Sequence, residues 1–153
     1  MKITVSVDVG APVSTVWAAL EQIERHVEWM ADAEEISFRT ERRRGVGTEF
    51  ACLTRVGPLS TVDVMTVTQW EPQRAMAVRH RGLVSGFGRF ELEPVDGGRT
   101  RFTWSETVHL PPRLGGRLGE IVAGRWVLRR VWRGNLERFR RLVETGRPPD
   151  AGG

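Results

Sequence analysis

The feature that most constrains the fold is a change of hydrophobic period along the chain, from two residues to about 3.6. Between residues 36 and 110, apolar and polar residues alternate in runs broken by short segments with Gly or Pro. This pattern predicts six consecutive strands in an antiparallel meander. After Pro111 and Pro112, apolar residues at helical spacing run from Leu118 to Val143 and predict one long helix that ends near Gly146.

The N-terminal segment adds a strand and helical structure to this plan. Residues 3–9 alternate and predict the first strand. Pro12 and the apolar residues that follow it at helical spacing as far as Val27 predict a helix of about four turns, with Trp29 just beyond it or on a short second helix. A seven-stranded sheet with one apolar face needs a cover, and only the C-terminal helix is long enough.

These elements predict an α+β fold in which a curved, seven-stranded antiparallel sheet wraps around the long C-terminal helix, with one or two short helices after strand 1. Because strongly twisted sheets curl, a cavity can remain between the sheet and the helix. The chain of 153 residues suits one domain. We expect this domain to span residues 1–146 and residues 147–153 to form a disordered tail.

Composition narrows the functional classes. The chain has 40% hydrophobic and 27% charged residues and lacks a signal-peptide or membrane-spanning pattern, so a cytoplasmic protein is expected. Its net charge of +4 is the balance of 23 basic residues against 19 acidic ones. The basic residues are 22 Arg and one Lys, an imbalance typical of a GC-rich genome, and no nucleic-acid-binding signature accompanies them. The single cysteine, Cys52, is interpreted as a small buried hydrophobe. Three scattered His residues give no metal-ligand spacing, so neither a metal nor another cofactor is expected.

Strand parity predicts which side chains face the cavity, because alternate residues point to the same face of a sheet. In residues 62–70, the alternating set from Val62 to Trp70 contains no charge and ends in a Trp, so it is assigned inward, and the other set, Asp63, Met65, Val67 and Gln69, is assigned outward. The last strand places Glu106 inward and His109 outward. The predicted inward set is Val62, Val64, Thr66, Thr68, Trp70, Met76, Val78, His80, Phe90, Leu92, Phe102, Trp104, Glu106 and Val108.

No residue is assigned as catalytic outright: Glu106 and His80 are conditional candidates for catalysis and are also predicted to contact a ligand. Their strands both flank the strand of Phe90, so their backbones lie about 9–10 Å apart, a span that long side chains or a ligand can bridge. Glu106 is interpreted as a ligand anchor, a general base, or the structural partner of a helix arginine, either Arg125 or Arg129. His80 is either an acid–base group or a satisfied core histidine.

Other candidate ligand contacts are aromatic or hydroxyl side chains. Large aromatic surfaces supply most of the contact to an apolar ligand, and inward hydroxyls indicate a cavity that is partly wet. These contacts are predicted at Trp29, Thr54, Thr66, Thr68, Trp70, Phe90 and Trp104. Trp17, Trp126 and Trp132 are interpreted as helix packing residues, and His26 as a cation at a helix end.

Several stretches together resemble the helix-grip superfamily of Bet v 1-like and START-like domains, more narrowly its bacterial polyketide cyclase/dehydrase and lipid-transport type. They are VDVGAPVSTVWAAL at 7–20, HVEWM at 26–30, GVGTEF at 45–50, VTQWEP at 67–72 and FELEPVDGGRTRFTW at 90–104. The resemblance implies a cavity for a lipid, an isoprenoid or a polyketide-like molecule. Aromatic cyclases of this superfamily often place Arg and Tyr in the cavity, whereas this chain has no Tyr.

Three functions follow from the pattern and the resemblance. The preferred one is binding or carriage of a small hydrophobic ligand. The alternative is a polyketide cyclase or dehydratase that uses Glu106 and His80 as acid and base, and the second alternative is a module that binds a protein partner. No nucleic acid and no integral membrane association are expected, and the oligomeric state, a homodimer included, is left open.

Overall fold

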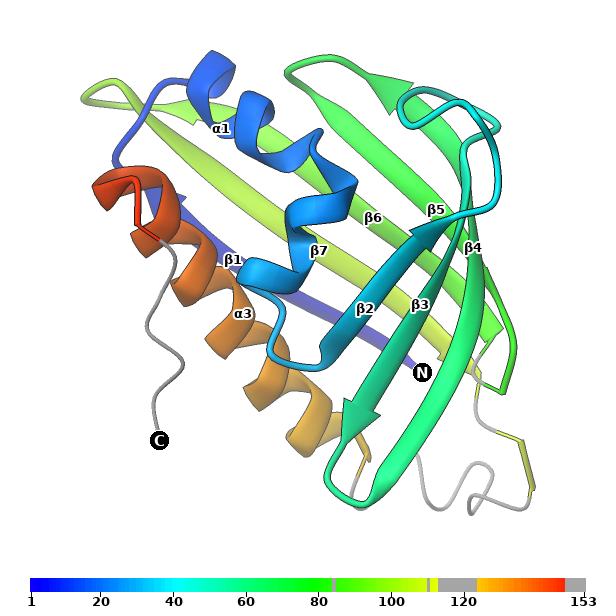
Figure 1. Cartoon of the computed structure of the whole chain (residues 1–153). Helices are drawn as coiled ribbons and strands as arrows, with labels where there is room; N and C mark the ends of the chain where they lie inside the picture. The colour runs from blue at the N-terminus through cyan, green and yellow to red at the C-terminus, as the bar shows by residue number, and fades with distance from the viewer. Residues whose placement is uncertain (84, 110, 113–123, 148–153) are drawn as a thin grey trace.

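The computed structural model describes residues 1–83, 85–109, 111–112 and 124–147 (Figure 1). Two short helices follow the first strand, six strands come next, and one long helix closes the chain. The elements are β1 (Lys2–Val9), α1 (Val13–Leu20), the 3-10 helix η1 (Ile23–Glu28), β2 (Ala33–Phe38), β3 (Glu49–Val56), β4 (Leu59–Glu71), β5 (Ala75–Arg81), β6 (Ser85–Val95), β7 (Arg99–His109) and α3 (Arg125–Thr145).

The seven strands form one antiparallel sheet in the order β1-β7-β6-β5-β4-β3-β2. Strands β2 to β7 are a meander in chain order, as the turn pattern predicted, and β1 pairs with β7. The sheet curves, and α1, η1 and α3 lie on its concave side (Figure 1). The predicted α+β helix-grip architecture is confirmed.

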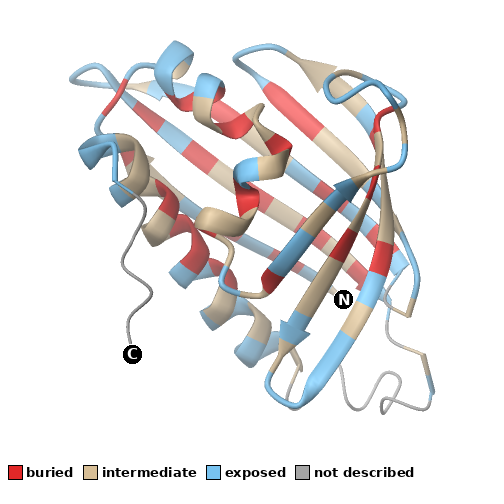
Figure 2. Ribbon diagram, viewed as in Figure 1, coloured by how far each residue is buried: buried red, intermediate tan, exposed pale blue. Residues whose placement is uncertain are grey.

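Helix α3 covers the sheet with one apolar stripe, because an amphipathic helix buries the face it turns to the core. Its buried residues are Trp132, Asn135, Leu136 and Phe139, and Figure 2 shows the buried side turned toward the strands. The helix ends at Gly146, whose φ of 68° is the left-handed conformation that glycine adopts readily. The predicted helical positions 118–122 and the predicted tail beyond residue 147 lie outside the described residues.

The helical segment after β1 is two short helices, as one form of the fold prediction allowed, and not one helix of four turns. Gln22, with φ −82° and ψ 77°, separates α1 from η1. The backbone N–H of Ile23 donates to the carbonyl of Glu21, a short-range bond that an α-helix does not make. After this break, η1 runs in a new direction from α1 and contacts β2 (Figure 1).

Trp29 packs in the hydrophobic core and, contrary to the prediction from the sequence, does not line the cavity between the sheet and the start of α3. Its side chain is 1% exposed. Its ring centroid lies 5.0 Å from that of Phe139, 6.1 Å from Phe90 and 6.3 Å from Phe102. These contacts, edge-on with Phe102 and Phe139 and tilted with Phe90, join the end of η1 to the sheet and to α3, so Trp29 holds three layers of the fold together.

A β-bulge in β4 makes part of the predicted strand parity wrong. Val67 pairs with Val78, but the next pair is Gln69 with Ala77, so the register shifts between Val67 and Gln69. Before the bulge the inward residues are therefore Thr61, Asp63, Met65 and Val67, whereas Val62, Val64, Thr66 and Thr68 do not face the cavity. Thr66 instead donates to Glu49 on the outer face.

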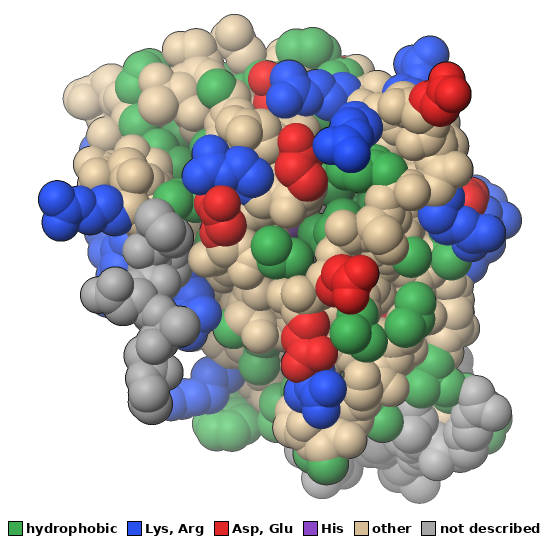
Figure 3. All heavy atoms as spheres, viewed as in Figure 1, with side chains coloured by type: hydrophobic (Ala, Val, Ile, Leu, Met, Phe, Trp, Pro, Cys, Tyr) green, Lys and Arg blue, Asp and Glu red, His purple; other side chains and the backbone are tan. Residues whose placement is uncertain are grey.

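The surface carries both signs of charge. On the face shown in Figure 3, Lys and Arg side chains are spread among Asp and Glu and are not gathered in one patch. In the part of the chain that the structure describes, no helix is long and apolar enough to cross a membrane.

Candidate ligand-binding pocket

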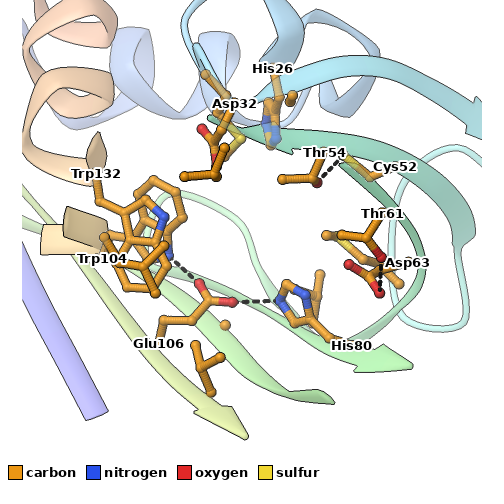
Figure 4. Close-up of a pocket in the computed structure, with 18 of the residues that line it drawn as sticks. His26, Asp32, Cys52, Thr54, Thr61, Asp63, His80, Trp104, Glu106 and Trp132 are labelled. Atoms are coloured by element: carbon orange, nitrogen blue, oxygen red, sulfur yellow. Dashed lines mark hydrogen bonds and ion pairs between the residues drawn. The ribbon is translucent and has the colours of Figure 1, made fainter. Parts of the chain in front are cut away.

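A pocket of about 390 Å³ lies between the concave face of the sheet, η1 and the start of α3. Its walls are mainly apolar, with Trp104 of β7 and Trp132 of α3 stacked at a centroid distance of 5.1 Å on one side. Figure 4 shows polar side chains on the other sides. The polar and sulfur-bearing groups that line the pocket include His26, Asp32, Cys52, Thr54, Thr61, Asp63, His80 and Glu106.

Glu106 and His80 meet in this pocket. Nε2 of His80 lies 2.7 Å from Oε1 of Glu106, and the indole N–H of Trp104 donates to Oε2 of Glu106 at 2.6 Å. Both carboxylate oxygens of Glu106 are thus engaged by protein groups (Figure 4). Burial of His80 lowers its pKa. The hydrogen bond to Glu106 and the negative charges of Glu106 and Asp63 outweigh burial and raise the pKa of His80 above its ordinary value. The imidazole is therefore held toward its charged form.

Gly88 leaves room for this pair. His80 on β5 and Glu106 on β7 are on next-nearest strands, and Gly88 of β6 lies between them, paired with Val78 and Glu106. A Cβ built on Gly88 would lie 3.1 Å from Oε2 of Glu106 and 3.2 Å from Nε2 of His80. The missing side chain allows the two residues to reach each other across a strand.

Asp63 is a second buried acid on the pocket wall, 4% exposed. The hydroxyl of Thr61 donates to its Oδ1 at 3.3 Å. A Cβ on Gly82 would lie only 1.9 Å from the same oxygen. Glycine at residue 82 is therefore required for the carboxylate to occupy this position.

Asp32 is a third acid, at the turn between η1 and β2. Asn135 of α3 donates from Nδ2 to Oδ1 of Asp32 at 2.6 Å and accepts from the backbone N–H of Ala31 at 2.9 Å. Burial and the charge of Glu106 raise the pKa of Asp32, while the Asn135 hydrogen bond opposes that rise. Asn135, fully buried in α3, thus fixes one edge of the pocket to the helix.

Comparison with known proteins identifies the family. Residues 1–144 match the family described as polyketide cyclase/dehydrase and lipid transport. The chain belongs to this family. A search of curated proteins gave no match.

Solved structures share the family fold at low sequence identity. A protein from Thermus thermophilus has a TM-score of 0.80 at 15% identity, over 95% of this chain and 99% of its own. The Zhui aromatase/cyclase from a Streptomyces species has a TM-score of 0.70 at 19% identity, over 100% and 98%. A START superfamily protein from Mycobacterium smegmatis has a TM-score of 0.64 at 14% identity, over 89% and 97%. At these identities the likeness shows the fold alone.

In this member of the polyketide cyclase/dehydrase and lipid transport family, the sequence-predicted site residues separate into three groups. The pocket is lined by Thr54, His80, Phe90, Trp104 and Glu106. Trp29 and Trp70 pack in the core, where Trp70 contacts Trp17 at 5.3 Å. Thr66 and Thr68 lie away from the pocket because of the β4 bulge. His109 is exposed, as strand parity predicted.

Several pocket residues of this family member were assigned otherwise from the sequence. Asp63 is the clearest case: an acid within a β-branched strand was the available signal, but parity without the bulge placed it outward. Trp132 lines the pocket, whereas Trp126, also predicted to pack, is 70% exposed. Arg125 and Arg129 are exposed, so neither is the predicted partner of Glu106. Within the described ranges, no group of three or more His, Cys, Asp or Glu residues is arranged to hold a metal ion.

His26 is not the predicted cation at a helix end. It is 5% exposed on η1, and its Nε2–H donates to the carbonyl of Leu20 at 2.7 Å. Burial lowers its pKa to about 4, although the Leu20 carbonyl and the charge of Glu24 oppose this shift. A neutral imidazole therefore joins η1 to the end of α1 beside the pocket.

This burial predicts an acid-sensitive fold. The folded pKa of His26, about 4, lies below its ordinary 6.5, so the unfolded chain binds the proton more readily. Stability is therefore lost as pH falls from 6.5 toward about 4, by about 3 kcal/mol. Urea unfolding of the wild type and His26→Gln across this range measures the effect. The variant should lose less stability on acidification, and parallel profiles would contradict the assignment.

Proposed function

We propose that this protein binds a small, largely apolar molecule in the pocket between the sheet and α3. The pocket itself is the main support for this proposal. Its volume of about 390 Å³ lies within the range of small-molecule sites, and its walls combine apolar surface with a few polar groups. Family membership adds support, because the family description includes both lipid transport and polyketide cyclase/dehydrase.

The energetics of such a site come mainly from its apolar walls. Each 100 Å² of apolar ligand surface removed from water contributes roughly 2.5 kcal/mol before the costs of association. The stacked Trp104 and Trp132 offer flat aromatic contact, and Phe90 extends it across β6. The polar groups near Glu106 and His80 would then orient the polar end of the ligand.

Two matched threonine variants test this proposal. Thr54 lines the pocket and Thr66 lies on the outer face, on the neighbouring strand. Thr54→Phe should fill the pocket and reduce binding of Nile red, a neutral apolar fluorophore, by about tenfold or more, while Thr66→Phe should bind as the wild type does. Fluorescence titration measures both, with thermal unfolding as the check on folding. Equal binding by the two variants would place the probe elsewhere and count against the proposal.

One observation favours an enzymatic alternative, a cyclase or dehydratase. The buried His80–Glu106 pair, 2.7 Å apart on the pocket wall, joins a carboxylate to an imidazolium. In an aldol closure the carboxylate would take a proton from the carbon beside a carbonyl, and the imidazolium would give its proton to the second carbonyl oxygen as the carbon–carbon bond forms. With a substrate that is turned over, Glu106→Gln should abolish most of the rate, and unchanged turnover would remove the role.

A further inference from the structure

Apolar side chains are exposed where the pocket opens to the surface. Leu59 at the start of β4 and Val127 in the first turn of α3 both line the pocket, yet they are 41% and 39% exposed. The turn between β3 and β4 and the first turn of α3 lie at the same end of the molecule (Figure 1). The pocket therefore opens between these two turns, with an apolar side chain on each side.

Trp126 extends this apolar surface, since it precedes Val127 on α3 and is 70% exposed. Within the described ranges, the large apolar side chains that are exposed are Val46, Leu59, Val62, Phe87, Trp126 and Val127. Half of this set belongs to the two turns at the opening. We call Leu59, Trp126 and Val127 the apolar rim, and a cluster of this kind indicates a surface that contacts a partner.

Arginines surround Trp126 on the outer side of α3. Arg129, Arg130 and Arg133 follow Trp126 by three, four and seven residues, a spacing that puts all four on one face of a helix. All four residues are exposed. The guanidinium carbon of Arg130 lies 6.0 Å from the centroid of the Trp126 ring. Positive charge and apolar surface therefore lie side by side at this end of the molecule.

The stretch of α3 that carries these arginines contains no acid. Residues 125–136 include four Arg and no Asp or Glu. The first acid beyond them, Glu137, forms an ion pair with Arg140. On the other side of the opening, Glu34 of β2 forms an ion pair with Arg55 of β3. The start of α3 is therefore a positively charged surface beside the opening.

This combination fits an anionic lipid bilayer better than it fits other anionic partners. Tryptophan is favoured at the boundary between headgroups and hydrocarbon, and nearby arginines are attracted to anionic headgroups. A nucleic acid would engage the arginines but would leave Leu59 and Val127 in water. An opening that faces lipid would also spare an apolar ligand a passage through water.

We propose that the apolar rim and the arginines around Trp126 dock this end of the protein on a bilayer with anionic headgroups. The apolar rim enters the headgroup region, and the arginines contact anionic groups around it. The docking does not depend on what the pocket holds. Its role, to bring the opening of the pocket against lipid, rests on the proposed ligand-binding function.

Sedimentation with sucrose-loaded vesicles tests the docking. The full chain is mixed at neutral pH with vesicles of phosphatidylcholine, either alone or with about one third phosphatidylserine. We expect binding to the anionic vesicles to be at least about tenfold tighter than to the neutral ones, and to weaken as salt is added. Equal binding to both vesicles, or none to the anionic ones, would overturn the proposal. Tighter binding to a short DNA duplex than to the anionic vesicles would overturn it in favour of a nucleic-acid surface.

Two pairs of an aromatic ring and an arginine on this chain locate the docking surface. Trp126→Ala should weaken binding to anionic vesicles by about fivefold or more, and Arg130→Gln by about threefold or more. The matched controls are Phe87→Ala and Arg79→Gln. Phe87 is exposed on β6, its ring centroid 5.1 Å from the guanidinium carbon of Arg79, and both control variants should bind as the wild type does. Equal losses in the two pairs would overturn the assignment to α3.

Nile red titration without vesicles separates the docking from the proposed function. Trp126 is not among the described residues that line the pocket, so Trp126→Ala should bind Nile red as the wild type does. A wild-type protein that binds Nile red but no vesicles would overturn the docking and leave the proposed function standing. One that binds anionic vesicles but no Nile red would support the docking and count against the proposed function.

Discussion

Replacement of Trp29 by alanine is expected to lower the free energy of unfolding by about 3–5 kcal/mol. Trp29 is 1% exposed and contacts aromatic rings of β6, β7 and α3, so its removal leaves a cavity where three layers meet. The surrounding rings belong to different elements and cannot all move into the gap. Denaturant unfolding followed by circular dichroism measures the loss, since the substitution itself changes the fluorescence.

Trp126 provides the matched control on the same chain. It is 70% exposed on the first turn of α3. Trp126→Ala should change the free energy of unfolding by no more than about 0.5 kcal/mol. A loss below about 1 kcal/mol in Trp29→Ala, or losses of similar size in the two variants, would contradict the placement of Trp29 in the core.

Removal of the charge of Glu106 is expected to have the largest effect on the pocket. In Glu106→Gln, burial of His80 is no longer offset by the carboxylate, so the pKa of His80 should fall from above to below its ordinary value. The unfolding free energy should fall by about 1–3 kcal/mol. Titration of the His80 ring by nuclear magnetic resonance, together with denaturant unfolding, measures both changes.

The pH dependence of this loss has a definite sign. Because the folded pKa of His80 is raised, its contribution to stability is fully present below the unfolded value of 6.5 and is lost as pH rises through the folded value. The difference between wild type and Glu106→Gln should thus be larger at about pH 5–6 than at alkaline pH. A difference that grows with rising pH would contradict the charged pair.

Gly88 allows the pair to be disturbed without a change of either ionisable group. In Gly88→Ala the new Cβ would press on both partners, so the pKa of His80 should fall in the same direction as in Glu106→Gln. Gly134→Ala is the control, since a Cβ there meets nothing within 4 Å. It lies inside α3 and should stabilise the protein by about 0.5–1 kcal/mol while the His80 pKa stays unchanged.

Hydrophobic period, together with Gly and Pro at the turns, predicted the architecture because most elements of this fold bury one continuous face. The strands from β2 to β7 alternate along the sequence, and α3 carries its apolar residues on one stripe. Local breaks were harder to predict. Gln22 divides the first helical segment and the bulge at residues 67–69 reverses parity within β4, and neither position carries a Gly or Pro that would have indicated it.

Strand parity correctly predicted the inward-facing residues of the pocket on the strands that have no bulge. On β5, β6 and β7 the inward assignments of His80, Phe90 and Glu106 agree with the pocket lining. Asp32 could not be placed in this way because it lies in a turn, where side-chain direction has no period. Trp29 and Trp132 exchanged their predicted environments because sequence shows that a large ring is buried but not whether it faces a core or a cavity.

Native mass spectrometry of the protein purified from its own host tests the central claim most directly. We predict a bound species of small-molecule mass that is released by organic solvent, that is largely lost in Thr54→Phe, and that is retained in Thr66→Phe. A wild-type protein that carries no ligand from its host and does not bind Nile red would contradict the account.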